Sequence, residues 1–316
     1  NILRDLGKLE KAEKHFSQAI SLKPDFDLAL LNRGQLFFDK GEFDKALKDA
    51  DSFNSKESRS LAIETLYELG RIDEIYERLE KTSHSDDENI RLAAFSSFLA
   101  VHENKDTPHN FCPKPLSFLY VSNLKSHLKD YEGFIKEIIN ELSDVKTVWE
   151  PRKNTTVNGF HTPNYLNLFS NPSERILELK SIIFNELDVY YSKYSEENCS
   201  YIKKWPSIKN LKGWHVILKK QGYQKAHIHP FGWLSGVIYL KVVPSLDKAE
   251  GAIEFSLNGE NYSNINSPQL IHQPKLGDIV FFPSSLYHRT IPFNTETDRI
   301  VISFDLMPPN FTAVET

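Results

Sequence analysis

The chain has 316 residues, which is enough for two domains with cores of their own. Its hydrophobic fraction of 40% is that of an ordinary globular protein, and a formal charge of −5 speaks against nucleic-acid or membrane-surface binding. Two cysteines are too few for a disulfide framework, and no apolar run is long enough to span a membrane, so we expect a reduced, cytoplasmic protein.

The first part of the chain, residues 1–105, predicts a series of helix pairs. Gly7, Leu9 and Ala12 recur 34 positions later as glycine, phenylalanine and alanine. This period, with small residues at helix contacts, resembles the tetratricopeptide repeat. A second repeat covers about residues 27–54, and a third, around Gly70, is degenerate. Each repeat hides its apolar face by stacking on the next, so we expect a short solenoid.

This solenoid has two alternative roles. It forms either a concave groove for a peptide or protein, or a brace that packs on the domain behind it. Few repeats are present, so the two alternatives stand about even. On the repeat consensus, Asn1 falls inside the first helix, so we expect part of that helix to lie upstream.

The second domain is expected at residues 106–316. The polar stretch 102–114 contains two prolines and no periodicity, which is typical of a domain boundary. Behind it the pattern predicts a strand at 116–122, a helix at 130–142, a polar loop at 154–164, and a long helix that runs to Tyr194 from its N-cap, Ser173.

From residue 212 onward the helical patterns stop, and short strands with turns follow. The expected strands are 213–219, 232–243, 252–257, 269–273, 278–282 and 299–306. Many short strands after helices favour an α+β domain that ends in a β-sandwich or barrel.

Three histidines in this region form a candidate metal site. His227 and His229 are two residues apart, so on a β-strand both point to the same side, about 7 Å apart. His288, at a later strand, completes a facial set of three that leaves open positions on an octahedral iron, as oxygen activation needs. The alternative is a pair of surface imidazoles beside a turn.

Arg299 opens an alternating strand and shares one face with Val301 and Ser303. A guanidinium inside a barrel is costly unless a carboxylate meets it. A dicarboxylic cosubstrate would be such a partner, in bidentate form. The alternative is a salt bridge within the chain, with these acidic candidates: Asp298, Asp305 or Glu254.

The run from Trp214 to Phe304 resembles the iron(II)/2-oxoglutarate-dependent dioxygenase superfamily, and within it a branch found in bacteria and phages. The motifs are His-x-His-Pro at 227–230, Leu-Ser-Gly-Val-x-Tyr-Leu at 234–240, and Gly-Asp-x-Val-Phe-Phe-Pro-Ser-Ser-Leu-x-His at 277–288. The resemblance implies a double-stranded β-helix barrel of the jelly-roll or cupin type with flanking helices, behind the tetratricopeptide solenoid.

The resemblance also implies Fe(II), 2-oxoglutarate and O₂, with ascorbate as a supporting reductant. Carried over residue by residue, His227 and His288 match ligand histidines, and Arg299 matches the arginine that binds the distal carboxylate of 2-oxoglutarate. Ser303, on the same face as this arginine, could add a hydrogen bond. No catalytic side chain beyond the metal ligands is expected, because the iron and cosubstrate carry the chemistry.

One position departs from the superfamily pattern. Most members have Asp or Glu two residues after the first histidine, where this chain has His229. Three neutral imidazoles leave a ferrous ion one negative charge short of the usual set. We favour His229 as the third ligand. The alternative is a carboxylate from elsewhere, and the candidates are Asp247, Glu250, Glu254 and Asp278.

Several weaker candidates remain. Tyr239, Trp214 and Trp233 could line the cosubstrate pocket, although an aromatic core is the default. Asn158 and His161 are placed on a substrate-facing loop, and loops 154–164 and 258–268 are expected at the pocket mouth. Other positions have structural alternatives: Gly236 as a ligand approach or a barrel bend, Arg289 at an anionic substrate group or the rim, and His215 and His272 as structural residues.

Two functions of different classes follow. The first is an Fe(II)- and 2-oxoglutarate-dependent dioxygenase that hydroxylates a protein, a peptide or a small molecule and releases succinate and CO₂. A protein substrate could be presented by the repeat groove. The alternative is a tetratricopeptide interaction protein whose cupin-like barrel binds a metal or ligand without turnover. No code in the sequence names the substrate or the oligomeric state.

Overall fold

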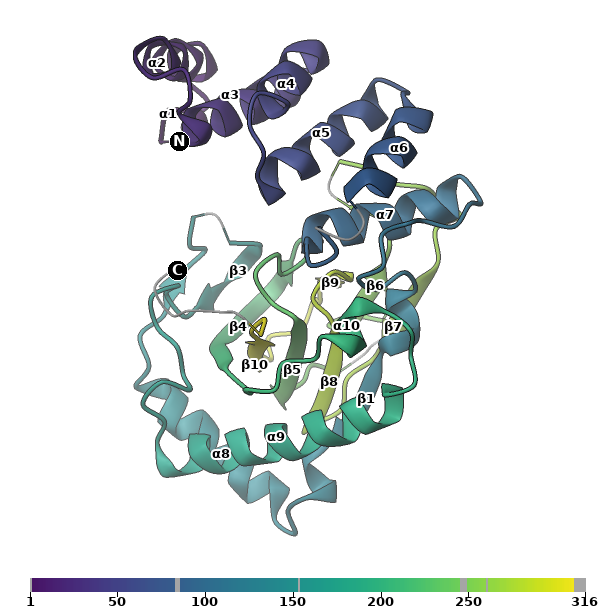
Figure 1. The fold of residues 1–316 in the computed structure, drawn as a ribbon. Helices are drawn as coiled ribbons and strands as arrows, with labels where there is room; N and C mark the ends of the chain where they lie inside the picture. The colour runs from purple at the N-terminus through teal and green to yellow at the C-terminus, as the bar shows by residue number, and fades with distance from the viewer. Residues whose placement is uncertain (1, 83–85, 153, 245–248, 260, 310–316) are drawn as a thin grey trace.

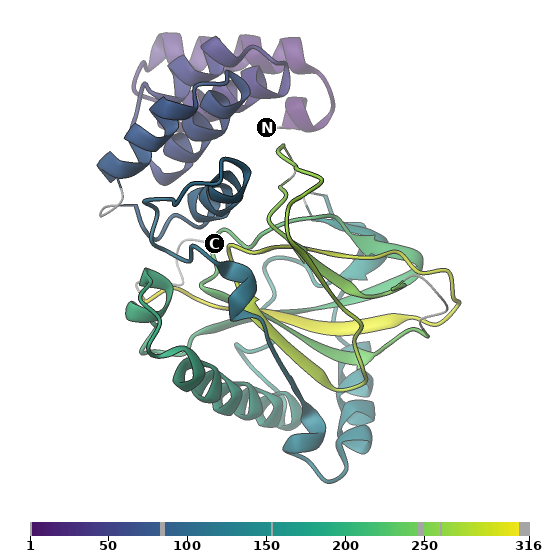
Figure 2. The same ribbon diagram turned by 90° about the vertical axis from the view of Figure 1, so that its right-hand side faces the viewer.

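The fold is that of a computed structural model, which describes residues 2–82, 86–152, 154–244, 249–259 and 261–309. A helical part formed by the first third of the chain lies above a β-rich part formed by the rest (Figure 1). A quarter turn shows the helical layers stacked over one side of the sheets (Figure 2).

The helical part consists of consecutive helix pairs, as the 34-residue period predicts. Three glycines end the first helix of a pair with positive φ, at +70° for Gly7, +74° for Gly41 and +69° for Gly70, a conformation that suits glycine at a helix end. The helices are α1 (Ile2–Asp5), α2 (Leu9–Leu22), α3 (Asp27–Asp39), α4 (Phe43–Ala50), α5 (Lys56–Glu68), α6 (Ile72–Thr82) and α7 (Ile90–His102).

Helix α7 joins the solenoid to the β-rich part. The ring of Tyr262 lies 5.0 Å from the Phe95 ring and 4.7 Å from the Phe98 ring, and the Asn264 side chain contacts His102 at 3.0 Å. The segment around Tyr262 therefore packs on α7, and the expectation that loop 258–268 shapes the pocket mouth is wrong. Apolar packing holds this loop against α7, the last helix of the solenoid, which supports the brace alternative for the C-terminal end of the solenoid.

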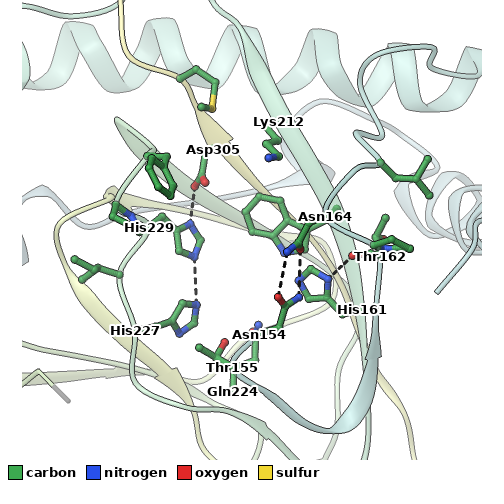
Figure 3. Close-up of a pocket in the computed structure, with 17 residues that line it drawn as sticks. Asn154, Thr155, His161, Thr162, Asn164, Lys212, Gln224, His227, His229 and Asp305 are labelled. Atoms are coloured by element: carbon green, nitrogen blue, oxygen red, sulfur yellow. Dashed lines mark hydrogen bonds and ion pairs between the residues drawn. The ribbon is translucent and has the colours of Figure 1, made fainter. Parts of the chain in front are cut away.

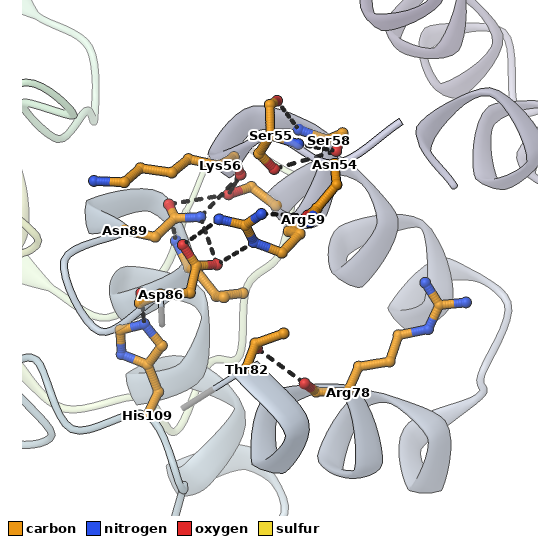
Figure 4. Close-up of polar contacts among 12 residues, drawn as sticks. Asn54, Ser55, Lys56, Ser58, Arg59, Arg78, Thr82, Asp86, Asn89 and His109 are labelled. Atoms are coloured by element: carbon orange, nitrogen blue, oxygen red, sulfur yellow. Dashed lines mark hydrogen bonds and ion pairs between the residues drawn. The ribbon is translucent and has the colours of Figure 1, made fainter. Parts of the chain in front are cut away.

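A polar cluster reinforces the same junction (Figure 4). The buried Asp86 carboxylate accepts two hydrogen bonds from Arg59 of α5, both of 2.8 Å, and one of 3.2 Å from Asn89, the N-cap of α7. His109, in the linker, contacts the backbone carbonyl of Asp86 through Nε2 at 3.1 Å. One residue thus connects the solenoid and the helix that ends it through its carboxylate, and the linker through its backbone carbonyl.

Two long helices cover one face of the larger sheet (Figure 1). Helix α8 (Tyr131–Ser143) has Asp130 as its N-cap, and α9 (Glu174–Tyr194) has Ser173, whose hydroxyl accepts from the Ile176 amide. The predicted helix ranges and the Ser173 cap are confirmed. The shorter elements are η1 (Pro115–Phe118), η2 (Leu124–Ser126) and α10 (Ser200–Lys203).

The strands form two antiparallel sheets, a large one in the order β1-β8-β5-β10-β4-β3-β2 and a small one in the order β7-β6-β9. These sheets and flanking helices confirm the predicted α+β fold. The strands are β1 (Tyr120–Asn123), β2 (Val148–Trp149), β3 (Thr156–His161), β4 (Leu211–Gln224), β5 (Leu234–Lys241), β6 (Ile253–Ser256), β7 (Gln269–His272), β8 (Asp278–Pro283), β9 (Tyr287–Thr290) and β10 (Arg299–Leu306).

Two strands differ from the expectation. The range 154–164 is mostly strand β3 and not a loop, because its polar sequence pairs along β4. The start of the predicted strand 116–122 forms the 3-10 helix η1, and only its end joins β8 as β1. Tertiary pairing overrode local polarity in the first case, which sequence pattern alone does not register.

Strand β10 separates two apolar cores, as its alternation predicts. Val301 belongs to the core inside the barrel, and Ile302 and Phe304 belong to the core under α8 and α9. Arg299 and Ser303 therefore point with Val301 into the barrel. Within the described ranges, none of the helices has the length and apolar character that a membrane span needs.

Candidate active site

The two segments that carry the histidines are joined by backbone hydrogen bonds. The amide of His227 donates to the carbonyl of His288 and the amide of His288 donates back to His227, both at 3.1 Å. This isolated bridge connects the end of the large sheet to β9 of the small sheet. The expectation that His227 and His229 lie on a regular strand is wrong, since the chain is extended there but forms only this one bridge.

The three imidazoles converge on one point. Their ring centres are 4.3 Å apart for His227 and His288, 5.0 Å for His229 and His288, and 5.1 Å for His227 and His229. One nitrogen of each ring lies within 4.8 Å of the others, a spacing that suits ligands of a single ion. The structure thus brings together the three residues that the sequence singles out.

Hydrogen bonds fix which nitrogen each ring presents. Each Nδ1 faces an oxygen that can only accept: the carbonyl of Lys225 at 2.7 Å for His227, the carbonyl of Leu286 at 3.1 Å for His288, and the carboxylate of Asp305 at 2.6 Å for His229. Each Nδ1 therefore carries a hydrogen and each Nε2 a lone pair, and the Nε2 atoms of His227 and His229 lie 3.2 Å apart. Outer partners of this kind orient metal-binding histidines.

Burial keeps the rings of His227 and His288 neutral. Burial, together with the neighbouring His229, lowers the pKa of His227 to about 3. The pKa of His288 also lies well below its usual range, because the ring is buried and faces the other two. Neutral imidazoles with free Nε2 atoms are the form that binds a divalent cation, so the donor set fits the ferrous ion that the resemblance implies.

Arg299 is buried in the barrel with 2% of its surface exposed. Its Nε donates to the Gly251 carbonyl at 3.1 Å, and its guanidinium lies over the Tyr239 ring at 4.9 Å. Among the described residues, neither its Nη1 nor the Tyr239 hydroxyl has a hydrogen-bond partner. Burial lowers the pKa of Arg299 and raises that of Tyr239 to about 12, so an anion is the partner that would compensate both groups.

The salt-bridge alternative for Arg299 is not supported. Each acidic candidate is bound to another residue: Asp298 to Lys219 at 2.7 Å, Glu254 to Arg289 at 2.8 Å, and Asp305 to His229. The Arg289–Glu254 pair also places Arg289 on the small sheet and not in the pocket.

A small cavity of about 20 Å³ lies between the histidines and the arginine, and its lining includes Trp214 and Ser303. A larger, open cavity of about 310 Å³ lies on the outer side and shares Trp214, His227 and His229 with it. Figure 3 shows this outer cavity, with His229 between Asp305 and His227.

The weaker candidates divide between the cavities and the core. His161 lines the outer cavity and stacks on Trp214 with ring centres 6.1 Å apart, whereas Asn158 lies in β3 outside the residues that line it. Trp233 is core, against Phe111 at 5.1 Å. Two other positions have structural partners: His215 contacts Thr162, and His272 contacts Asp278. Gly236 lines the inner cavity and also packs on the Phe304 ring, which an added Cβ would meet at 2.3 Å.

No described carboxylate replaces His229 in the cluster. Glu254 binds Arg289, Asp278 binds His272 and Asn123, and Glu250 contacts the Asn294 amide, while Asp247 lies outside the described residues. The acidic residue that does touch the cluster is Asp305, which the sequence suggested only as a partner for Arg299. The signal that could have found it is alternation, since Asp305 shares the inward face of β10 with Arg299.

The barrel, the imidazole cluster and the buried arginine are those of a metal-dependent jelly-roll domain. Residues 212–305 match the family described as "Putative 2OG-Fe(II) oxygenase", and residues 1–41 match the TPR repeat. The chain carries a 2OG-Fe(II) oxygenase domain behind an N-terminal tetratricopeptide repeat and is an oxidoreductase that uses Fe(II) and 2-oxoglutarate. The family match supports a dioxygenase over a barrel without turnover.

Solved structures show weaker likeness. A Pseudomonas putida prolyl-4-hydroxylase is 10% identical over 60% of this chain and 92% of its own, with a TM-score of 0.43. A Trichoplax adhaerens prolyl hydroxylase in complex with a hypoxia inducible factor peptide is 15% identical over 72% and 94%, with a TM-score of 0.44. HygX from Streptomyces hygroscopicus, with nickel and 2-oxoglutarate bound, is 14% identical over 61% and 84%, with a TM-score of 0.42. A comparison with curated proteins finds no match.

Proposed function

We propose that His227, His229 and His288 hold Fe(II), that Arg299 and Tyr239 bind the distal carboxylate of 2-oxoglutarate, and that the outer cavity takes the C–H to be hydroxylated. The observation that carries the proposal is that three imidazoles with converging Nε2 atoms and a buried guanidinium with an unpaired Nη1 line one cavity. Ser303 and Trp214 line the same cavity and complete the cosubstrate site.

Bound iron and cosubstrate would supply the oxidative chemistry, and the protein would position both. The neutral Nε2 atoms bind the ion, and the Nδ1 hydrogen bonds hold the rings in place. The Arg299 guanidinium and the Tyr239 hydroxyl orient the anion from the far end of the barrel. The ring of Trp214 lines both cavities, so it lies where substrate and cosubstrate would meet.

The inner cavity holds about one water, so a five-carbon dianion needs its lining side chains to move. Trp214 and Gln224 line both cavities, and an outward turn of either side chain would join them. We therefore expect 2-oxoglutarate, or the inert analogue N-oxalylglycine, to change the fluorescence of Trp214.

The test is succinate formation from 2-oxoglutarate with Fe(II) and ascorbate, alongside Mn(II) binding without turnover. His229→Ala should abolish metal retention and succinate formation. The matched control is His272→Ala, which removes an imidazole bonded to Asp278 away from the cluster. Retention of metal by the first variant, or its loss in both, would contradict the assigned ligand set.

For the substrate, we propose a protein or peptide that the helical repeats hold while one side chain enters the outer cavity. The support is a second cavity of about 270 Å³ in the helical part, whose lining mixes apolar residues with charged ones. Its two arginines are already paired, Arg59 with Asp86 and Arg78 with Asp51. Lys81, whose 3.9 Å contact with Glu77 is exposed, is the lining cation most open to a carboxylate of a bound peptide. The outer cavity is open, and its rim includes Phe231, which is 72% exposed.

Mass spectrometry tests this substrate class. Peptide pools from a whole-cell digest, incubated with the enzyme, should gain one oxygen atom at a few sequences. Lys81→Glu should reduce that gain without changing succinate formation in the absence of peptide. The control is Lys14→Glu, an exposed change on α2, which should leave both the oxygen gain and succinate formation unchanged. Oxidation of small molecules alone would contradict the proposal.

We also place the protein in the cytoplasm, which the two free, buried cysteines support.

A further inference from the structure

The three histidines differ in what holds them. His227 and His288 donate through Nδ1 to neutral backbone carbonyls, whereas His229 donates to the carboxylate of Asp305 at 2.6 Å. Hydrogen bonds to an ionised acceptor are shorter and about twice as strong as neutral ones. The charge of Asp305 therefore reaches the cluster through one imidazole, that of His229.

The carboxylate is itself held for this contact. Its Oδ1 accepts from the Ser235 hydroxyl at 2.7 Å, and that hydroxyl lies 2.8 Å from the hydroxyl of Ser284. Both Asp305 and His229 are largely buried, with side-chain exposures of 11% and 12%. These contacts hold the carboxylate against the imidazole at the wall of the outer cavity.

The loop that carries His229 is fitted closely to this carboxylate. The Gly232 amide donates to the His229 carbonyl at 3.0 Å, and the His229 amide donates to the Ser284 carbonyl at 3.0 Å. A Cβ at Gly232 would lie 2.9 Å from the Asp305 carboxyl carbon and 2.6 Å from the Ser284 hydroxyl, so only glycine fits there. The backbone of this loop therefore holds His229 in contact with the carboxylate of Asp305.

We propose that Asp305 is a positioning residue for the metal centre: it holds His229 with Nε2 facing the ion and supplies, through the imidazole, the negative charge that three neutral ligands lack. This inference rests on the proposed metal site. It assigns to the end of β10 a role in metal affinity, in addition to the role of Arg299 at the start of the same strand.

The first test measures metal affinity without turnover. Binding of Co(II) to the full chain is followed by its visible absorption and by competition with a chelator. Asp305→Asn keeps an acceptor for Nδ1–H but removes the charge, and it should weaken binding by about 10-fold; Asp305→Ala should weaken it by about 100-fold. Asp298→Asn, which removes a carboxylate bound to Lys219 at the other end of the barrel strands, is the matched control and should change nothing.

The second test asks whether the charge acts through His229. His229→Asp places a carboxylate directly at the ion, and Asp305 would then face a like charge. Adding Asp305→Asn to His229→Asp should therefore raise Co(II) affinity, the opposite of its effect in the natural chain. A loss of the same size in both backgrounds would overturn the proposal, because the charge would then act at a distance and not through the imidazole.

The outcomes separate this inference from the function on which it rests. If His229→Ala abolishes Co(II) binding while Asp305→Asn binds as the natural chain does, the metal site stands and the role of Asp305 is rejected. If the natural chain binds no divalent ion, the metal site itself fails. Unfolding of the metal-free variants is measured in parallel, and a shift in the Co(II) spectrum at unchanged stability is the result expected of a positioning residue.

Discussion

The guanidinium of Arg299 lies 4.9 Å from the centre of the Tyr239 ring, and each group keeps an unpaired polar atom in the barrel interior. The guanidinium lies against the aromatic ring, and its Nη1 and the phenol hydroxyl are two donors that can meet one carboxylate. Two buried donors without a partner lower the stability of the ligand-free protein, because their desolvation is not offset by a hydrogen bond. A bound carboxylate would accept both hydrogen bonds and offset that free energy.

We expect Arg299→Lys to raise the 2-oxoglutarate concentration needed for half-maximal succinate formation by about 10- to 100-fold, because an ammonium cannot make the bidentate contact. Arg289→Lys, at a partly exposed pair with Glu254, serves as the control and should leave the requirement unchanged. An unaltered requirement in both variants would make Arg299 a structural residue only. Initial rates over a 2-oxoglutarate titration measure the effect.

Tyr239→Phe should raise the same requirement by about 10- to 100-fold, since it removes one hydrogen bond to a charged carboxylate, worth about 1.5–3 kcal/mol, and keeps the ring under Arg299. Stability should not fall, because the hydroxyl has no partner among the described residues. A urea titration checks stability, and the 2-oxoglutarate titration checks binding. A large loss of stability with no change in the requirement would place the hydroxyl in the fold and not in the site.

Acid should destabilise the protein through His215. Burial lowers the pKa of His215 to about 4. Below pH 6.5 this imidazole therefore binds a proton in the unfolded chain but stays neutral in the folded chain. This contribution to stability is present above pH 6.5 and is lost as the pH falls towards 4, with a full size of about 3 kcal/mol. His215→Asn should flatten the decline, whereas the exposed His15→Asn should not. Urea unfolding at several pH values gives the slope.

The junction of Figure 4 predicts a stability effect remote from the site. Asp86→Ala removes the carboxylate that receives both Arg59 bonds, and it should cost about 3 kcal/mol, as for a buried ion pair with one partner partly exposed. The control is Glu77→Ala, at an exposed pair with Lys81, which should cost under about 0.5 kcal/mol.

The order of unfolding can be followed with two signals. All four tryptophans follow residue 106, so their fluorescence reports the β-rich part, whereas circular dichroism also reports the helical part. In Asp86→Ala, a circular dichroism signal that falls before tryptophan fluorescence would show that the helical part unfolds first.

Much of this fold could be predicted from local pattern. The glycines at 7, 41 and 70, the Ser173 cap and the alternation of Arg299–Leu306 each depend on residues close together in sequence. The three histidines could be picked out because their motifs lie in short, recognisable runs. What the sequence could not show were pairings between distant segments, such as β3 with β4, and the contact between His229 and Asp305, 76 residues apart.

The reciprocal amide bridge between His227 and His288 has a consequence for how the enzyme acquires its ion. Because the chain itself sets the spacing of these rings, a divalent metal enters a coordination site that is already assembled, and loading costs little rearrangement of the polypeptide. Such a rigid pocket also offers the same nitrogens to nickel, cobalt or zinc, several of which bind imidazole more tightly than ferrous iron does. The metal supply in the cell would then decide which cation occupies the enzyme. Binding of a cation other than Fe(II) would abolish its activity without unfolding it.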